Sequence, residues 1–114
     1  MRATLPWPPT INNCWRRGRN GTVHCSNEVV LFRREVARRI GPWKKPLKGR
    51  LKVAIMAYPP DNRRRDLDNI LKSLLDSLQL AGVFLDDSQI DELWIERGRR
   101  KGSGEVDITV DEIG

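Results

Sequence analysis

The 114-residue chain has only two cysteines, one histidine and one tyrosine, and it has no apolar run near the roughly 20 residues that cross a bilayer. Two cysteines are too few to hold a secreted mini-protein together. The first residues contain no apolar block of the signal-peptide kind, and no repeat or low-complexity tract follows. These absences exclude a membrane protein and a disulfide scaffold. They predict a cytoplasmic protein that forms one domain over residues 1–114.

Several kinds of catalytic and metal centre are also poorly supported. Cys14, His24 and Cys25 are candidates for a zinc site, but an adjacent His and Cys do not easily reach one tetrahedral centre and no fourth ligand follows. No arrangement of Ser, Cys or His suggests nucleophilic catalysis. The chain also lacks any acidic residue two positions before a lysine, which is the pattern of restriction-enzyme-type nucleases.

Charge is unevenly distributed along the chain. Residues 1–65 contain 16 basic and 3 acidic residues, a net charge of +13, whereas residues 66–114 contain 5 basic and 12 acidic residues, a net charge of −7. A basic segment favours a polyanion, because each phosphate that Lys or Arg neutralises releases counterions. The alternative is a basic face exposed to solvent. The acidic part could hold metal ions that themselves contact phosphate.

Hydrophobic periodicity predicts the elements of the fold. Alternating apolar residues predict strands at 2–7, 50–58, 92–99 and 105–110, and they direct Leu93 and Ile95 inward. Apolar residues three and four positions apart predict helices at 26–40, with Ser26 as N-cap, and at 66–80. We predict a hairpin turn at 101–104 and a loop over 10–25 with a tight turn at Asn20-Gly21. The order of elements predicts an α+β fold, a small mixed β-sheet with two main helices packed on it.

The segment Arg63-Arg64-Arg65-Asp66-Leu67-Asp68-Asn69 carries the strongest chemical signal. Three cations precede two carboxylates that are spaced by one residue at the predicted start of a helix. This spacing lets Asp66 and Asp68 converge on one point, and such oxygen ligands suit Mg²⁺, which binds through one or two carboxylates plus substrate phosphate. The structural alternative is that Asp66 is the helix N-cap and Asp68 is a first-turn residue.

Two neighbouring features favour a site over a helix cap. Lys72 follows Asp68 by four residues and therefore lies on the same helix face. Asp86-Asp87 follows the helix where the chain has turned back, so a third carboxylate could complete a metal site with Asp66 and Asp68. For Lys72 the alternative is an ordinary surface ion pair, and for Asp86-Asp87 it is a turn.

Four stretches of the chain resemble the RusA family of Holliday junction resolvases. They are Leu5-Pro6-Trp7-Pro8-Pro9 with Asn12-Asn13, Arg64-Arg65-Asp66-Leu67-Asp68-Asn69 with Lys72, Leu85-Asp86-Asp87-Ser88-Gln89, and Gly104 to Ile113. The resemblance covers essentially the whole chain and implies a homodimer of α+β subunits. It also implies that Asp66, Asp68 and Asp87 bind Mg²⁺, with Mn²⁺ as a substitute, that Lys72 is essential and that Asp86 is functionally sensitive. The Cys14-Trp15 pair differs from the tyrosines that the family often carries there.

The resemblance implies a crossover junction endodeoxyribonuclease, an enzyme that resolves four-way junctions by paired symmetric nicks during recombination and DNA repair. Branched DNA is the expected partner, and no membrane is expected to take part. The expected contacts to DNA come from Arg63, Arg64, Arg65, Asn69, Arg16, Arg17 and Arg19. Apolar surface for pairing two subunits is expected at Trp94, Ile95 or the N-terminal strand. Two alternatives stay open, a branched-DNA-binding protein with little or no catalysis and a nuclease that acts on RNA.

Overall fold

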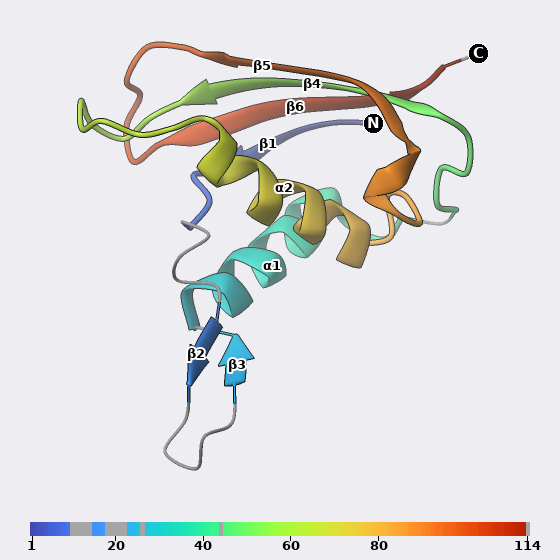
Figure 1. The fold of residues 1–114 in the computed structure, drawn as a ribbon, viewed down its shortest axis with the longest axis horizontal. Coiled ribbons are helices and arrows are strands. Elements are labelled where there is room, and N and C mark those ends of the chain that lie inside the picture. Colours follow the sequence, from blue (N-terminus) through green and yellow to red (C-terminus); the bar gives the residue numbers. More distant parts are fainter. Residues whose placement is uncertain (10–14, 18–22, 26, 44, 114) are drawn as a thin grey trace.

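The computed structural model describes residues 1–9, 15–17, 23–25, 27–43 and 45–113, and in these ranges two helices cover one face of a four-stranded sheet (Figure 1). The sheet contains β1 (Arg2–Pro6), β4 (Leu51–Tyr58), β5 (Ile90–Arg97) and β6 (Glu105–Glu112). The helices are α1 (Asn27–Ile40) and α2 (Asp68–Leu80), and a 3-10 turn, η2 (Asp87–Gln89), leads into β5. The predicted α+β fold is therefore confirmed, with element boundaries shifted by one or two residues.

The core lies between the sheet and the helices, where the alternation of the strands meets the apolar stripes of the helices. On β4 every second residue from Leu51 to Ala57 is fully buried, and β6 buries Val106, Ile108 and Val110 in the same way. The α2 stripe buries Ile70, Leu74 and Leu78, and α1 adds Phe32 and Val36. Within the described residues, neither helix has the length and apolar character needed to cross a bilayer. This packing fixes α2 along the sheet and so determines where its N-terminal end lies.

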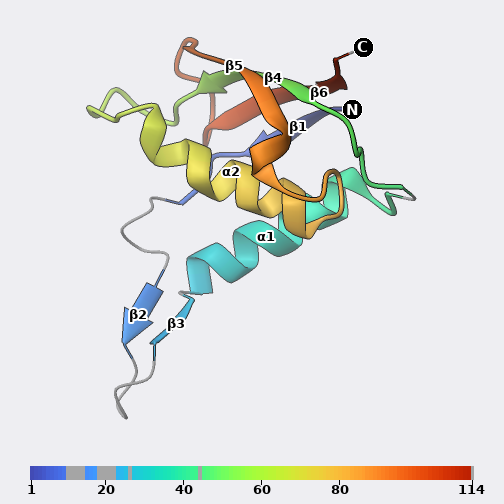
Figure 2. The same cartoon turned by 45° about the vertical axis from the view of Figure 1, so that its right-hand side comes forward.

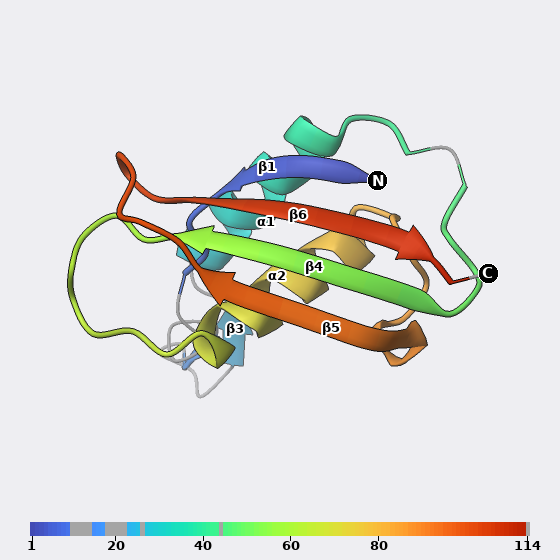
Figure 3. The same ribbon diagram turned by 90° about the horizontal axis from the view of Figure 1, so that it is seen from above.

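The strand order of the sheet is β1-β6-β4-β5, so β4 has β6 on one side and β5 on the other (Figure 3). β4 pairs antiparallel with β6 and parallel with β5, which it reaches through α2. The predicted hairpin between the last two strands is therefore wrong. A tight turn does form, because the Gly104 amide donates to the Lys101 carbonyl oxygen over 2.8 Å. However, the segment from Gly98 to Gly104 crosses the end of β4 instead of joining adjacent strands, and the Lys101 amide donates to the Pro59 carbonyl oxygen over 2.9 Å.

Two short strands occur where a loop was predicted over 10–25. β2 (Trp15–Arg17) and β3 (Val23–Cys25) pair antiparallel and extend away from the sheet and helices (Figure 2). Strands of three residues are too short for an alternating apolar pattern to stand out. The predicted turn at Asn20-Gly21 and the predicted cap Ser26 lie outside the described residues.

The strand β5 forms one edge of the sheet, and this position modifies the predicted burial of its side chains. Leu93 and Ile95 are in register with the buried Val53 and Ile55, so they lie on the helix-covered face as predicted. Leu93 is nevertheless 46% exposed, because β5 has no further strand beside it. Trp94 points to the opposite face and is 50% exposed.

The charged side chains on the face of the sheet that points away from the helices are mostly acidic. The pairing register places charged residues of all four strands there. They are Arg2, Lys52, Glu92, Glu96, Glu105, Asp107 and Asp111. We call this surface the open face. Much of the acidic charge of residues 66–114 therefore lies on the open face, away from the start of α2.

Candidate active site

The loop between β4 and α2, residues 59–67, carries the predicted Arg-Arg-Arg-Asp-x-Asp segment. α2 begins at Asp68, and its N-cap position is Leu67, which has no side-chain hydrogen bond to the helix. Asp66 contributes its backbone carbonyl, which accepts from the Asn69 amide over 3.2 Å. The Asp66 side chain therefore does not cap the helix, and this alternative is wrong.

The carboxylates of Asp66 and Asp68 are both exposed at the start of α2. Within the described part of the chain, neither carboxylate has a hydrogen-bond or ion-pair partner. Two acidic side chains two residues apart, next to an arginine run and without a structural contact of their own, have oxygen atoms available to a ligand. Hard divalent cations prefer such oxygen ligands.

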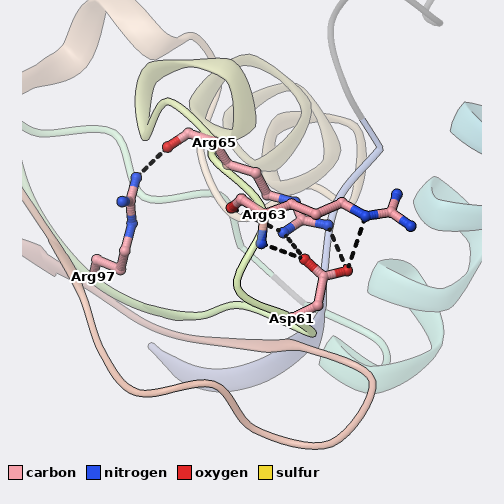
Figure 4. Close-up of polar contacts among 4 residues, drawn as sticks. All are labelled: Asp61, Arg63, Arg65 and Arg97. Carbon is pink, nitrogen blue, oxygen red and sulfur yellow. Dashed lines mark hydrogen bonds and ion pairs between the residues drawn. The ribbon is translucent and has the colours of Figure 1, made fainter.

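Asp61, which was not among the predicted site residues, contacts the arginines that precede this pair (Figure 4). Its carboxylate accepts two hydrogen bonds from the Arg65 guanidinium, one of them over 3.1 Å, and one from the Arg63 amide over 2.9 Å. The side-chain hydrogen bond from Arg65 and the backbone hydrogen bond from Arg63 hold the pKa of Asp61 well below its usual range. The Arg65 guanidinium also lies over the Trp7 ring, 5.8 Å from its centroid. Arg65 is thus held by Asp61 and Trp7.

Arg64 and Asn69, for which contacts to DNA are predicted, lie beside the acidic pair. A cavity of about 360 Å³ is lined by Trp7, Arg64, Arg65, Asp66, Asn69 and Ile70. Arg64 is exposed, and no partner is found for it among the described residues. The two further predicted arginines Arg16 and Arg17 lie on β2, and Arg19 lies outside the described residues.

Lys72 lies one turn into α2, and its partner is an acidic residue further along the helix. The Lys72 Nζ atom is 3.1 Å from the Asp76 Oδ1 atom. The side chain of Lys72 is 60% exposed, so this is an i, i+4 surface pair of the kind that contributes about 0.3–0.5 kcal/mol. The structure therefore contains the surface ion pair that was the alternative for Lys72, with Asp76 as the acidic partner.

Asp86 and Asp87 lie in the turn that follows α2. The Asp86 carboxylate accepts from the Ser88 amide over 3.1 Å, and hydrogen bonds from Ser88 lower the pKa of Asp86. The side chain of Gln89 holds this turn, because its Oε1 atom accepts from the Leu85 and Asp86 amides and its Nε2 atom donates to the carbonyl oxygens of Leu47 and Gly49, each over 2.9 Å. The turn that was the alternative for Asp86-Asp87 is therefore present.

One chain does not bring Asp87 to Asp66 and Asp68. The 13 residues of α2 span about 20 Å, and η2 follows the C-terminal end of the helix whereas the acidic pair lies at its N-terminal end (Figure 1). In the described ranges, no three His, Cys, Asp or Glu side chains are arranged so that they could hold a metal ion. The predicted three-carboxylate site is therefore divided between the two ends of α2.

Comparison with known proteins confirms the family resemblance that the four sequence stretches indicated. The family model described as endodeoxyribonuclease RusA matches residues 6–111. A protein of Enterobacteria phage HK97 named crossover junction endodeoxyribonuclease rusA is 41% identical over 111 residues, which cover 96% of this chain and 92% of the relative. The protein of the same name from Escherichia coli strain K12 is 38% identical over 113 residues, covering 97% and 93%. A third relative of this name, from Enterobacteria phage 82, is 38% identical over 113 residues, which are 97% of this chain and 93% of that protein.

Proposed function

This chain belongs to the RusA family of endodeoxyribonucleases, and on that premise we propose that it cuts four-way DNA junctions by hydrolysing phosphodiester bonds. The observation that supports this function most directly is the exposed Asp66 and Asp68 pair, which has no structural partner in the described residues and directly follows an arginine run. A DNA-binding surface that only held phosphates would gain nothing from two such carboxylates, because they would repel the backbone. They become useful when a cation neutralises them.

We infer that Asp66 and Asp68 hold Mg²⁺ and that Mn²⁺ can replace it. The donor set fits, because both side chains offer carboxylate oxygens and Mg²⁺ takes one or two carboxylates together with substrate phosphate. When bound, the ion activates water and stabilises the charge that develops on the leaving 3′ oxygen. Lys72 places a fixed cation one turn further along the helix, where it can position the scissile phosphate. Arg63 and Arg64 contact the flanking phosphates and set the register of the strand without reading its sequence.

Asp87 completes this site only if a second copy of the chain provides it. Within one chain Asp87 lies beyond the far end of α2, about 20 Å from Asp68 by the length of the helix. A twofold dimer in which the α2 helices run in opposite directions would bring Asp87 of one subunit to the acidic pair of the other. The exposed Leu93 and Trp94 on the edge strand β5 supply apolar surface for such a contact. A twofold enzyme also matches a four-way junction, which has two equivalent strands to cut.

Cleavage of a synthetic four-way junction in Mg²⁺ or EDTA, with linear duplexes of the same sequence, tests this function. We expect paired nicks in the junction, little cutting of the duplexes and none in EDTA. Asp68→Asn should lower the cutting rate by more than the roughly 10–100-fold typical of groups that only orient metal ligands, because it removes a ligand charge. Its binding to the junction should be unchanged or tighter, since the repulsion from phosphate falls.

Asp111→Asn is the matched control, because Asp111 is an exposed acidic residue on the open face. It should cut at the wild-type rate. Cutting by Asp68→Asn near the wild-type rate would overturn the assignment of the metal site. Tight junction binding without cutting by the wild-type protein would favour the alternative of a non-catalytic branched-DNA-binding protein.

A further inference from the structure

A second cavity, of about 300 Å³, lies on the other side of the 59–67 loop from Arg64 and Asn69. One wall comes from the loop itself, with Arg63, Arg65 and Asp66. The opposite wall comes from the end of β5 and the residues after it, with Arg97, Arg99 and Arg100. Two segments that are more than 30 positions apart in the sequence therefore meet next to the acidic pair.

The arginines of this cavity differ in how far they are already engaged. Arg65 and Arg63 contact Asp61, and Arg97 donates a hydrogen bond to the Arg65 carbonyl oxygen (Figure 4). Arg99 and Arg100 are exposed, and no partner is found for either of them in the described part of the chain. The wall formed after β5 therefore presents two cations whose charge no carboxylate of the described residues neutralises.

The backbone of this wall is fixed to the end of β4. The Gly98 amide donates to the Ala57 carbonyl oxygen over 2.7 Å, and the Lys101 amide donates to the Pro59 carbonyl oxygen over 2.9 Å. Gly98 also lies so close to Tyr58 that an added Cβ atom would be 2.5 Å from its ring. The Lys101 Nζ atom lies 5.4 Å from the centroid of the same ring and 3.1 Å from the Glu105 Oε1 atom. Arg99 and Arg100 thus extend from a backbone that is held on both sides and is positioned before any ligand arrives.

We propose that Arg99 and Arg100 each bind a backbone phosphate of the DNA strand that enters the site at Asp66 and Asp68. This inference rests on the proposed function and adds a second wall to the strand-binding surface. A cavity lined by guanidinium groups from two sides suits a phosphodiester that passes between them, because each guanidinium can donate two parallel hydrogen bonds to one phosphate. An enclosed small-molecule site would instead be lined mainly by apolar side chains.

The test is the salt dependence of junction binding by Arg99→Ala/Arg100→Ala, measured by fluorescence anisotropy in EDTA. We expect the affinity to fall about tenfold or more at low salt, and the slope of log affinity against log salt to decrease by about 2 for each subunit in contact with DNA. Lys45→Ala/Lys48→Ala is the matched control. It removes the same charge from two exposed residues that precede β4, at the end of the strand opposite the cavity. The control should bind with nearly the wild-type slope.

A double variant that matches the lysine control in affinity and slope would overturn the proposal, as would a wild-type protein that does not bind the junction in EDTA. Cutting of the junction by the wild-type protein in Mg²⁺ is scored separately, so failure of this cavity to bind phosphate is distinguishable from failure of the nuclease function.

If the double variant does not fold, as judged by circular dichroism, the two single variants should each give about half of the decrease in slope. Single variants with the wild-type slope would also overturn the proposal.

Discussion

Among the single residues of the site, Asp61 has contacts that decide which neighbouring cations remain available. Its carboxylate accepts two hydrogen bonds from the Arg65 guanidinium and one from the Arg63 amide. These donors hold the pKa of the Asp61 carboxyl group low. Asp61 therefore stays ionised throughout the neutral range and keeps the Arg65 guanidinium away from the carboxylates of Asp66 and Asp68. Arg65 directly precedes Asp66 in the sequence. Without the contact to Asp61, its guanidinium would compete with a metal ion for the Asp66 carboxylate.

This competition predicts the effect of Asp61→Asn. The amide removes the charge that holds Arg65, so Arg65 should turn toward Asp66 and weaken the binding of Mn²⁺ several-fold. The binding can be followed by isothermal titration without DNA, and the Mg²⁺ concentration for half-maximal cutting should rise in parallel. Glu35→Gln is a control, because Glu35 pairs with Arg38 and Arg39 on α1 and not at the site. Equal Mn²⁺ affinity in the wild-type protein and in Asp61→Asn would show that Asp61 has no positioning role.

At the scale of elements, η2 depends on one buried side chain for its attachment to the sheet. Gln89 satisfies two amides on its own turn and two carbonyl oxygens on the segment that precedes β4. A backbone turn of three residues has few hydrogen bonds of its own, so the position of Asp87 relative to the sheet is determined by this amide. If Asp87 acts in the proposed metal site, this contact also sets the position of one of its ligands.

Replacement of Gln89 should destabilise the whole domain. Gln89→Ala leaves four backbone groups without their partner and should lower the free energy of unfolding by about 2–4 kcal/mol, measured in urea. Gln89→Glu keeps the acceptor oxygen but places a carboxylate against the carbonyl oxygens of Leu47 and Gly49. Repulsion from these oxygens favours the neutral carboxylic acid. The pKa of the introduced carboxyl group should therefore rise above its value in the unfolded chain. Its stability relative to wild type should then be best at acidic pH and should decrease as pH rises through that raised pKa. A Gln89→Glu deficit that is independent of pH would contradict this role.

At the scale of the whole molecule, the fold separates charge of opposite sign onto different surfaces. The open face carries five acidic and two basic residues, whereas the arginines of the loop before α2 and those after β5 line one cavity with Asp66. DNA is repelled by the open face and attracted to the end of the sheet where β4 finishes. We expect this charge distribution to orient the molecule on DNA before any specific contact forms, and the proposed twofold dimer would present two such ends.

The proposed division of the metal site between subunits predicts that two inactive variants complement each other. Asp68→Asn and Asp87→Asn should each be inactive alone. In a mixed dimer, one site carries both substitutions and the other carries none, so a refolded equal mixture should regain single nicks at about a quarter of the wild-type number of sites. The products are counted on denaturing gels. If each subunit builds its own complete site, every site in the mixture keeps one substitution and no nicking should return.

Much of the fold was accessible from the sequence, because it depends on local patterns. The alternation of Leu51, Val53 and Ile55 predicted β4, and the leucine stripe predicted α2 almost to the residue. The order of the strands was predicted wrongly, because the residues of a tight turn at 101–104 suit two connections equally well. The same turn can join two adjacent strands in a hairpin or lie in a segment that crosses the end of a strand between them. Arg99 and Arg100 were not predicted as site residues, because their place beside Asp66 depends on β5 lying parallel to β4, which no local pattern encodes. Asp61 was not predicted either, although its contacts to Arg63 and Arg65 are local ones, two and four residues away.

The pairing of β1 with β6 has a consequence for how the protein is synthesised. Arg2 lies opposite Thr109, and the terminal amino group of Met1 donates to the Val110 carbonyl oxygen over 2.8 Å. β1 therefore has no partner in the sheet until β6 has been synthesised, about 5–20 s later at roughly 5–20 residues per second. During that interval β1 is an unpaired strand, and the sheet lacks the strand that joins β1 to β4. We expect the nascent chain to stay without a finished core, and therefore without a competent nuclease, until β6 has been synthesised.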